Sequence, residues 1–600
     1  MTSHIILGLH GFSAHSDREM HDAGVCLLED GEVIAAVDEE RLSRKKRDGS
    51  FPHLSYERVL EMTGLHSEDI NDVAFVDRRS PWQTIQVFRY AAETYLRTGV
   101  KPWSYLRFWI KHMFEFKRVP PGEIKPIQVA FLEHHQCHAA SAYYTSPWDE
   151  STVISLDGMG DFSVGGCVAH GKGGNLEIRK RTNGYFSPGH FYMIVTEYLG
   201  FIPGRHEGKV MGLAAHGDPN RAYTAMKKVI SYRPGKLDFI AGPVAEEFFE
   251  VICSPPGTRS RAWYAQNKWG NCKEGITDER PDSTELVYFR KAWADYSPED
   301  IAAAAQKRFE DVVIDFVRDA VSFIGCSNVA VAGGVFANVR LNQKILELPE
   351  VDNLYVHPNM SDGGLAVGAA LLLYHKQRNQ RRFLNYYHKP LKEVFLGPRY
   401  HEKEIEDILL AKGIDWSRPH NLASRISDAL IEGQIVGLFQ GKMEYGPRAL
   451  GNRSILAVAT DPTMRDTLNA RLKRTDFMPF APAILEEHAA EWFPAWRPQD
   501  VSSQFMTMTY NVAPSLAALV SEIVHIDGTA RPQIVRKNST PLLHNILTLY
   551  HNHTGIPLVI NTSFNMHEDP IVCSPKDALM VYLLGAVDIL VMEGILVDRS

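Results

Sequence analysis

The chain has 600 residues, too many for a single hydrophobic core, so its length predicts two or more domains. Hydrophobic residues make up 44% and charged residues 23% of the chain, as in an ordinary soluble globular protein. A formal net charge of −8 argues against a general nucleic-acid binder. No apolar run approaches the ~20 residues that a membrane span requires.

The cysteines and the N-terminal residues indicate in which cellular compartment the protein is expected. Seven cysteines are scattered without Cys-x-x-Cys pairs, and an odd, sparse set of thiols fits a reducing environment. The first residues, MTSHIILGLHGFS, lack the basic region and the cleavage site of a signal peptide. We therefore expect a cytoplasmic protein without a membrane partner.

The first predicted unit is a strand, a turn and a hairpin, in IILGLHGF and HDAGVCLLEDGEVIAAVDEER, with Asp30-Gly31 at the hairpin turn. A similar unit occurs in STVISLDGMGDFSVGGCVAHGKGG, where Asp157 ends a β-branched strand. A duplicated unit of this kind predicts an actin-like or sugar-kinase architecture, in which two similar halves hold a nucleotide between them. Such an analogy of fold shows no activity by itself.

Three histidines crowd the segment LEHHQCHAASAYY, after the predicted strand Ile127 to Leu132. A helix here places His134 and His138 on one face, four residues apart, while His135 points elsewhere. Two imidazoles at this spacing can bind one metal ion, although packed and surface histidines often show the same spacing. Asp157 is either a cation ligand or part of an ordinary Asx turn.

A long amphipathic helix is predicted from Ser297-Pro298, which open it, to Gly325, which ends it, and we interpret this helix as scaffold. In SNVAVAGGVFANVRLNQKILE, a strand over Val329 to Val331 leads through Gly333-Gly334 into a helix over VFANVRLNQKIL. A strand, a glycine turn and a helix N-terminus can seat a nucleotide, and they can equally form a βα turn without a ligand.

Asp362 precedes the glycine turn of HPNMSDGGLAVGAALLLYH. It either caps the Ala/Leu helix that follows or completes a site of two histidines and two aspartates. Such a ligand set suits Fe(II), Mn(II) or Zn(II).

Together these segments resemble the NodU/CmcH family of carbamoyltransferases, which includes tobramycin, cephem, ansamycin and saxitoxin-type enzymes. The segments similar to its first domain are EHHQCHAASA, SLDGMGD, GRHEGKVMGLAAHG, AGGVFANVRLN and SDGGLAVGAA. That domain is itself similar to the tRNA threonylcarbamoyl-transfer proteins. The segments that resemble the family's C-terminal, YrdC-like domain are GLFQGKMEYGPRALGNRSILA, MPFAPAIL, DGTARPQ and INTSFNMHEDPIVCSP.

The resemblance covers nearly the whole chain and implies an α/β protein of two domains. Residues 1–376 would form a duplicated, actin-like carbamoyl-transfer domain, 377–392 a linker, and 393–600 a YrdC-like domain. The implied activity is ATP-dependent O-carbamoyl transfer. The second domain would make carbamoyl-adenylate from carbamoyl phosphate and Mg-ATP, and the first would pass the carbamoyl group to a hydroxyl of a small-molecule natural product.

Two alternatives stay open at this stage. One is a threonylcarbamoyl-transfer enzyme acting on tRNA, which the net charge of −8 disfavours. The other is a non-catalytic protein that binds a nucleotide and a metal. For the leading hypothesis we expect no nucleic-acid partner and a monomer or homodimer.

In the first domain, the family pattern implies a divalent metal, iron or alternatively manganese or zinc, bound by His134, His138, Asp157 and Asp362. It makes His21, beside Asp22, the candidate general base that the acceptor hydroxyl requires. His10 and His15 are rivals, and His21 could instead be a turn residue bonded to Asp22. The residues expected to bind the adenylate here are Glu207, Lys209, Gly333, Gly334 and Asn338.

In the second domain, two polyanionic substrates call for arginine forks, lysines and backbone donors. Many relatives have arginine where Met478 stands, which shifts part of the phosphate binding onto other residues. The segment INTSFN follows a strand predicted over Pro557 to Ile560. The residues expected to bind ATP and carbamoyl phosphate are Lys442, Arg448, Arg453, Ser454, Lys473, Arg474, Arg531, Asn561, Ser563 and Asn565.

Two segments match no family motif closely. Lys101 to Arg118 is aromatic and basic at helical spacing, which predicts an amphipathic helix that packs on the domain or forms a wall of the acceptor pocket. Ile240 to Asp295 is polar and contains tryptophans, and we interpret it as surface insertion loops that could cover the acceptor site.

Overall fold

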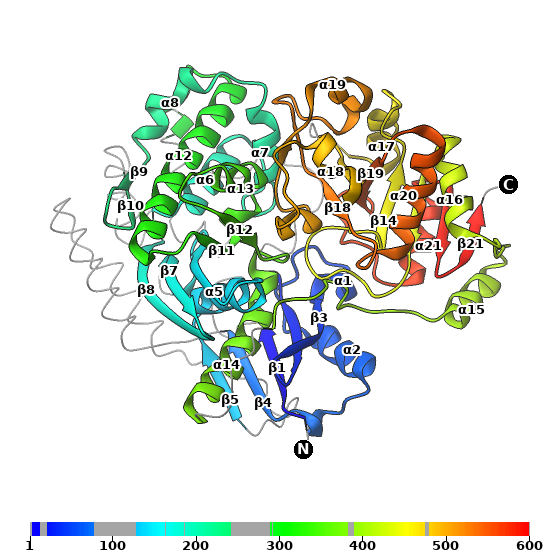
Figure 1. The fold of residues 1–600 in the computed structure, drawn as a ribbon, viewed down its shortest axis with the longest axis horizontal. Helices are drawn as coiled ribbons and strands as arrows, with labels where there is room; N and C mark the ends of the chain where they lie inside the picture. The colour runs from blue at the N-terminus through cyan, green and yellow to red at the C-terminus, as the bar shows by residue number, and fades with distance from the viewer. Residues whose placement is uncertain are drawn as a thin grey trace.

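The structure is a computed structural model that describes residues 3–11, 21–76, 128–161, 164–184, 186–241, 289–290, 292–381, 389–474 and 479–598. His15, Met478, the segment 101–118 and most of the segment 240–295 lie outside these residues. In Figure 1 the last third of the chain, yellow to red, lies beside and above the blue-to-green part. Among the described helices, none is both long enough and apolar enough to cross a bilayer.

The first sheet begins with the predicted strand and hairpin. The order is β3-β2-β1-β4-β5: the first three strands are antiparallel neighbours, while β4 and β5 run parallel to β1. Asp30 and Gly31 form the hairpin turn, as predicted. The strands are β1 (Ile5–His10), β2 (Gly24–Glu29), β3 (Glu32–Asp38), β4 (Asp72–Val76) and β5 (Gln128–Leu132).

The second sheet repeats this plan. Its order is β12-β11-β6-β7-β8, again an antiparallel run of three strands followed by two strands parallel to the first of them. The shared order and directions confirm the predicted duplication of a strand–turn–hairpin unit and extend it to five strands. The strands are β6 (Glu150–Leu156), β7 (Val164–Lys172), β8 (Asn175–Asn183), β11 (Asn328–Ala332) and β12 (Asn353–Val356).

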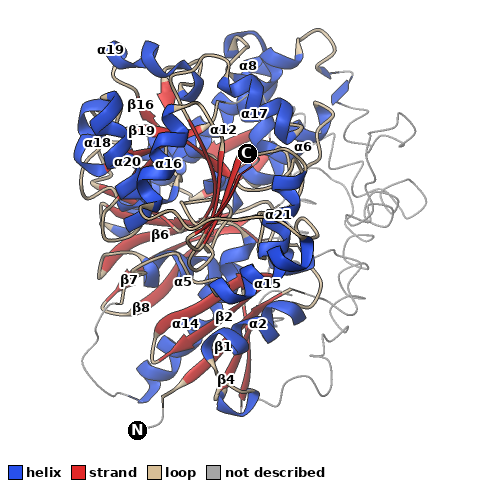
Figure 2. Cartoon of the chain, turned by 90° about the vertical axis from the view of Figure 1, so that its right-hand side faces the viewer, coloured by secondary structure: helices blue, strands red, loops and turns tan. Residues whose placement is uncertain are grey.

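Two helices are exchanged between the sheets. Helix α5 (His134–Thr145) follows β5 of the first sheet but packs on β6, β7 and β11 of the second. Helix α14 (Leu365–Arg381) follows β12 of the second sheet but packs on β1, β2 and β4 of the first. The two helices pack on each other between the sheets (Figure 2), where a side chain at Gly368 would collide with the Cys137 carbonyl.

Other helices cover the outer faces of these sheets. The predicted scaffold helix is α12 (Pro298–Ile324): Ser297 Oγ accepts a hydrogen bond from Asp300 N at 3.1 Å, and Gly325 ends the helix in the left-handed conformation. Phe289 and Trp293 stack at 4.3 Å in the core beneath it, so this end of the predicted surface loops is buried. The remaining elements here are α1 (Glu39–Ser43), α2 (His53–Thr63), α6 (Pro188–Tyr198), α7 (Glu207–Ala214), α8 (Pro219–Lys227), β9 (Ile230–Arg233) and β10 (Asp238–Ala241).

Two sequence predictions need correction in this half of the chain. The helix predicted over VFANVRLNQKIL is split into a 3-10 turn, η3 (Gly334–Ala337), and α13 (Val339–Leu346), because the Asn338 side chain accepts from Leu341 N at 3.0 Å and caps α13. Helix α14 continues past the predicted domain end at Lys376 to Arg381, since the residues between include no glycine or proline to stop it.

The part of the chain after residue 393, which we call the second domain, contains a mixed seven-stranded sheet in the order β18-β15-β19-β14-β13-β20-β21. The sequence predicted a strand that ends at Ile560, with Asn561 and Ser563 after it. Strand β19 instead extends to Ser563, so both residues lie within the strand. Its strands are β13 (Val436–Phe439), β14 (Arg453–Ala457), β15 (Ala481–Leu485), β18 (Gln533–Val535), β19 (Leu558–Ser563), β20 (Ile589–Met592) and β21 (Ile595–Asp598), and β16 (Tyr510–Asn511) pairs separately with β17 (Thr529–Ala530). Its helices are α15 (Glu402–Lys412), α16 (Leu422–Ile431), α17 (Met464–Leu472), α18 (Glu486–Trp492), α19 (Pro514–Ala517), α20 (Pro541–Thr554) and α21 (Pro575–Leu583).

The segment between the two parts of the chain contacts both of them. Ala36 N of the first sheet donates to Leu396 O at 3.2 Å, and Gly397 N donates to Met443 O at 2.9 Å. Residues 394–398 therefore fix the two parts against each other through backbone hydrogen bonds.

Candidate functional site

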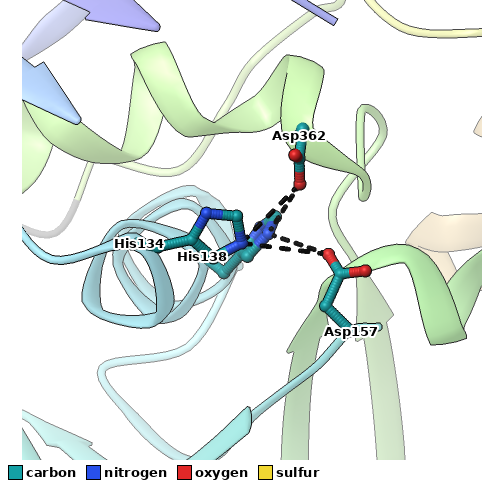
Figure 3. A group of neighbouring side chains, drawn as sticks. All are labelled: His134, His138, Asp157 and Asp362. Atoms are coloured by element: carbon teal, nitrogen blue, oxygen red, sulfur yellow. Dashed lines mark ion pairs between the residues drawn. The ribbon is translucent and has the colours of Figure 1, made fainter. Parts of the chain in front are cut away.

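The four predicted metal ligands lie together at the junction of the two similar sheets. His134 and His138 stand in the first two turns of α5, Asp157 follows β6, and Asp362 begins the 3-10 turn η4 (Asp362–Gly364) ahead of α14. One ligand atom from each residue lies within 4.8 Å of all the others. Figure 3 shows the two imidazoles on one face of α5, with the carboxylates of Asp362 and Asp157 opposite them.

The distances fit a group that shares one cation. His138 Nε2 lies 3.3 Å from Asp157 Oδ2 and 3.4 Å from Asp362 Oδ1. His134 Nε2 lies 3.7 Å from Asp362 Oδ1. Both Nε2 atoms are buried and have no hydrogen-bond partner among the described residues. A divalent cation satisfies such nitrogens, and two imidazoles with two carboxylates suit iron, manganese or zinc.

The carboxylates are held by the glycine turns around them. Asp157 accepts hydrogen bonds from Gly158 N at 2.6 Å and from Gly334 N at 3.2 Å. Burial lowers the pKa of His138, but Asp157 and Asp362 outweigh it and raise that pKa to about 9. In turn, the imidazoles overcome burial and hold the pKa of Asp362 well below its usual range.

His135 has a structural role. Its Nε2 lies 2.8 Å from the Val164 carbonyl oxygen, so that nitrogen carries the proton and donates. Its Nδ1 lies 3.0 Å from Ser155 Oγ and can accept. With both ring nitrogens bonded and the side chain fully buried, His135 lies outside the ligand group.

His21 and Asp22 lie at the edge of this group. His21 Nδ1 is 3.0 Å from Asp22 Oδ2 and 3.6 Å from Asp362 Oδ2, and 43% of the His21 side chain is exposed. Burial and Arg47 lower the pKa of His21, but Asp362 and Asp22 raise it above its ordinary value. Its rival His10 is buried, which lowers the pKa of that imidazole to about 4 and makes it a weak base.

The residues expected to bind adenylate fall into two sets. Gly333 and Gly334 form the turn against Asp157, and a side chain at Gly333 would collide with the Leu156 carbonyl, so this turn adjoins the ligand group. Asn338 instead caps α13 and exchanges hydrogen bonds with the Gln306 amide at 2.9 and 3.2 Å. Its side chain is therefore engaged in holding α12 and α13 together.

Glu207 and Lys209 lie on α7 at the boundary with the second domain. Glu207 accepts from Gly204 N, and burial raises the pKa of its carboxyl. Lys209 Nζ lies 4.0 Å from Glu568 Oε1, which His206 Nε2 also approaches at 3.1 Å. Glu568 thus joins the second domain to the segment GRHEGKVMG, a contact that the sequence did not indicate.

A group of three arginines forms the centre of the candidate site in the second domain. Burial, followed by the charges of Arg448 and Arg474, lowers the pKa of Arg531 well below its usual range. Burial lowers the pKa of Arg448 to about 10. Arg474 donates to Thr562 Oγ1 and Ser563 Oγ, both at 3.0 Å, so strand β19 orients it. Guanidinium groups that repel one another in this way favour an anion among them.

Arg453 does not belong to this group, which corrects the sequence prediction. It is fully buried at the start of β14 and stacks over Phe439 at 3.7 Å. Its guanidinium donates to the carbonyl oxygens of Gln440 at 2.7 Å and Pro398 at 2.9 Å. Because backbone carbonyls occupy these donors, the side chain holds loops together and does not face a substrate.

The other predicted residues of the second domain also divide by burial. Lys442 and Lys473 are exposed. Ser454 is buried and its Oγ accepts from Gly451 N at 2.8 Å. Asn561 Nδ2 donates to Gln533 Oε1 at 2.7 Å and Asn565 Nδ2 to Asp569 O at 2.8 Å, whereas the Oδ1 atoms of both have no partner among the described residues. These buried acceptors fit a ligand with hydrogen-bond donors.

Glu444 is a residue that the sequence analysis missed. It precedes the GPRALGNRS segment, and its Oε1 accepts from the backbone N–H groups of Leu450, Asn452 and Arg453 at 2.7 to 3.0 Å. This carboxylate therefore sets the shape of the loop that presents Arg448. The sequence offered one signal for this role, a glutamate next to a glycine-containing loop whose backbone N–H groups need acceptors.

Comparison with known proteins identifies the family. The family model described as Carbamoyltransferase N-terminus matches residues 16–371, and the one described as Carbamoyltransferase C-terminus matches residues 427–599. Similar proteins include nodulation protein NolNO of Sinorhizobium fredii, 30% identical over 97% of this chain and 79% of that protein. Nodulation protein NolO of Bradyrhizobium diazoefficiens is 31% identical over 78% of this chain and 79% of that protein.

Solved structures add little. Component A of the (R)-2-hydroxyglutaryl-CoA dehydratase of Acidaminococcus fermentans gives a TM-score of 0.31 at 15% identity, over 62% of this chain and 99% of that chain. HypF of T. kodakarensis gives 0.29 at 15% identity, over 63% of this chain and 48% of that chain. Scores this low support no argument about the fold or the activity.

The N-terminal match alone covers more than half of the chain, so the resemblance seen in the sequence motifs is confirmed. A non-catalytic binding protein is thereby set aside, because both matched regions are those of transferases. The chain belongs to the carbamoyltransferase family.

Proposed function

We propose that this protein is an ATP-dependent O-carbamoyltransferase with two sites. The second domain makes carbamoyl-adenylate from carbamoyl phosphate and ATP. The first domain transfers the carbamoyl group to a hydroxyl of a small natural product. Similarity to nodulation proteins NolNO and NolO, together with the carbamoyltransferase family match, supports this assignment.

One observation carries the proposal: Arg448, Arg474 and Arg531 form a half-buried group of positive charges, in which partial burial and the charges of Arg448 and Arg474 lower the pKa of Arg531. Triphosphate and carbamoyl phosphate are the anions that such a group suits, since guanidinium forks match phosphate oxygens. The unpartnered Oδ1 atoms of Asn561 and Asn565 supply nearby acceptors for the carbamoyl amide.

The first reaction balances without an oxidant or reductant. Carbamoyl phosphate and water give carbamate and phosphate. A carbamate oxygen then attacks the α-phosphorus of ATP, a new P–O bond forms, and pyrophosphate leaves. The arginine group binds the phosphates and stabilises the charge that moves onto the leaving pyrophosphate.

In the second reaction the acceptor oxygen bonds to the carbamoyl carbon, the bond from that carbon to the AMP oxygen breaks, and AMP leaves. His21 takes the hydroxyl proton, and Asp22, at 3.0 Å from its Nδ1, orients the ring and stabilises the imidazolium. His134, His138, Asp157 and Asp362 would hold a divalent metal, iron or alternatively manganese or zinc. When bound, this cation neutralises phosphate charge and polarises the reacting group.

The architecture that we propose accompanies this chemistry. The duplicated sheets fit an actin-like first domain, and the mixed sheet of the second domain fits a YrdC-like fold. The exposed side of His21 leaves room for a hydroxyl acceptor at the edge of the ligand group. We propose a small molecule as this acceptor, with no nucleic acid involved.

The test uses the purified full-length protein with carbamoyl phosphate, ATP and Mg²⁺ and no acceptor. We expect release of pyrophosphate and phosphate and a mass for carbamoyl-adenylate. ATP without carbamoyl phosphate is the control. If folded protein releases no pyrophosphate above this control, the proposed donor chemistry is wrong.

A further inference from the structure

The loop that presents Arg448 also enters the first domain. Its shape is set by Glu444, and its N-terminal side runs against the connecting segment, where Tyr445 N donates to Val394 O at 2.7 Å. Only Gly446 and Pro447 separate Tyr445 from Arg448. One short loop therefore contacts the arginine group at one end and the first domain at the other.

Tyr445 is buried at the contact with the first domain. Its hydroxyl lies 3.1 Å from His357 Nε2, and the two rings meet edge to face at 5.7 Å. The next residue, Gly446, accepts from Arg41 Nη2 through its carbonyl at 2.9 Å and has a φ of 113°. A side chain at this position would approach the Pro358 carbonyl to 3.0 Å, so the backbones of the two domains are in contact.

The hydrogen bonds around His357 fix its tautomer. The Thr145 hydroxyl donates to Ser141 O, so its oxygen can only accept from its other neighbours. Tyr355 donates to that oxygen at 3.1 Å, and His357 Nδ1, at 3.0 Å, must carry a proton and donate as well. His357 Nε2 is then an acceptor, and the Tyr445 hydroxyl is its donor.

This chain of hydrogen bonds touches both halves of the ligand group. Thr145 is the last residue of α5, the helix that carries His134 and His138. On its other side His357 packs against the turn of Asp362: a side chain at Gly364 would come within 3.0 Å of His357 Cδ2. The His357 ring thus contacts both the end of the helix that carries the imidazoles and the turn that carries the Asp362 carboxylate.

We propose that Tyr445, supplied by the second domain, is a positioning residue for the metal centre of the first domain, acting through His357. The inference rests on the proposed metal site. Residues that hold metal ligands in place commonly tune the affinity for the metal. Here the Tyr445 hydroxyl, at the far end of the hydrogen-bond chain, comes from the other domain. Metal binding is then a property of the docked two-domain chain.

The test is a Co²⁺ titration of the metal-free full-length protein, followed by visible absorption and by calorimetry. Tyr445→Phe keeps the ring and removes only the hydroxyl. We expect it to weaken Co²⁺ binding about tenfold and to change the absorption bands of the bound ion. In a His357→Asn background, Tyr445→Phe should weaken binding no further, because its route to the ligands is already broken.

Two controls separate the possible failures. Tyr143→Phe removes a different buried tyrosine hydroxyl. Tyr143 lies on α5, the helix that carries the two histidine ligands, and its hydroxyl donates to Asp149 O at 2.8 Å. This variant should leave Co²⁺ binding unchanged. Asp362→Ala should abolish binding. If the wild-type protein binds no Co²⁺, or binds it with Asp362→Ala as well, the metal site itself is wrong. If both behave as expected and Tyr445→Phe binds like the wild type, Tyr445 has no positioning role.

Discussion

The metal-ligand group of the first domain and the arginine group of the second are built on different principles. The residues of the first stand in the first two turns of a helix, directly after a strand and at the start of a 3-10 turn, so the backbone directs their short side chains toward one another. The arginines come from irregular segments, and their roles depend on which oxygens their long side chains reach. Arg453 donates to backbone carbonyls, whereas we propose that Arg448, five residues earlier, binds phosphate. Short side chains on regular elements reveal their function in sequence more readily than long ones in loops.

The largest expected effects test whether the two groups serve two separate reactions. Arg448→Ala should reduce pyrophosphate release by roughly 100- to 1,000-fold, because a charge that binds the phosphates is lost. His134→Ala should leave pyrophosphate release near the wild-type level and reduce carbamoyl transfer by at least about 100-fold. Both rates are measured with carbamoyl phosphate and ATP, with and without an acceptor hydroxyl.

The matched control is His135→Ala, a buried neighbour outside the ligand group, analysed for metal content alongside His134→Ala. The His134 variant alone should lose its metal through loss of a ligand. An equal fall of both activities in His134→Ala would contradict the division of labour between the domains.

A second test sharpens the contrast within the arginines. Arg453→Met should destabilise the second domain by about 3 kcal/mol, because the carbonyls of Gln440 and Pro398 lose their buried donors. Arg448→Met should not destabilise it, since the substitution removes a charge that repels Arg531. Urea unfolding of the two variants measures both effects. Equal destabilisation would place both arginines in structural roles.

A third test concerns protons in the metal-ligand group. The carboxylates of Asp157 and Asp362, acting against burial, raise the pKa of His138 to about 9, and a metal binds only neutral imidazole. Below pH 9 the cation must displace that proton, so affinity should rise about tenfold per pH unit toward pH 9 and then level off. Calorimetry in buffers of different ionisation enthalpy counts the released proton.

Asp157→Asn removes one of the two charges that raise this pKa, so the rise in affinity should end at a lower pH. An affinity independent of pH between 6.5 and 9 in the wild type would show that His138 is already neutral without the metal.

The smallest effect belongs to the contact between the two regions. The hydrogen bond from His206, then the charge of Arg205, overcomes burial and lowers the pKa of Glu568 to about 2. A carboxyl whose pKa is depressed on folding stabilises the protein above its unfolded value of 4.5, and this contribution is lost as the pH falls toward 2. Because 37% of the side chain is exposed, Glu568→Gln should cost less than about 1 kcal/mol at pH 7.

Thermal unfolding between pH 7 and pH 3 checks this prediction. The Glu568→Gln variant should lose less stability on acidification than the wild type. Glu347→Gln, at an exposed glutamate that, among the described residues, has no hydrogen bond or ion pair with Glu568, provides the comparison. Parallel curves for the wild type and the Glu568 variant would contradict the assignment.

Much of the first domain followed from local patterns in the sequence. The hairpin at Asp30-Gly31, the histidine helix and the capped helix from Ser297 all formed as predicted, because turn residues, period and caps act over a few neighbours. The order of five strands in each sheet had no such local signal. It depends on contacts between segments far apart in the chain.

What the sequence could not reveal were side-chain partnerships. Asn338 looked like a nucleotide contact but its amide bonds Gln306, 32 residues away. Arg453 carried the right chemistry for a phosphate, and only the fold shows that the Pro398 and Gln440 carbonyls surround it. Tyr445 and His357 meet across 88 residues, and neither has a local pattern that implies the other.

The exchange of α5 and α14 has a consequence for how the chain is made. The strands β1 to β5 leave the ribosome first, but the helix that covers their inner face follows β12. The first sheet therefore keeps an apolar face open throughout the synthesis of the second and closes only when α14 emerges. Within the first domain the oldest strands are covered last, so we expect a protein shortened before Leu365, which lacks α14, to aggregate instead of folding halfway.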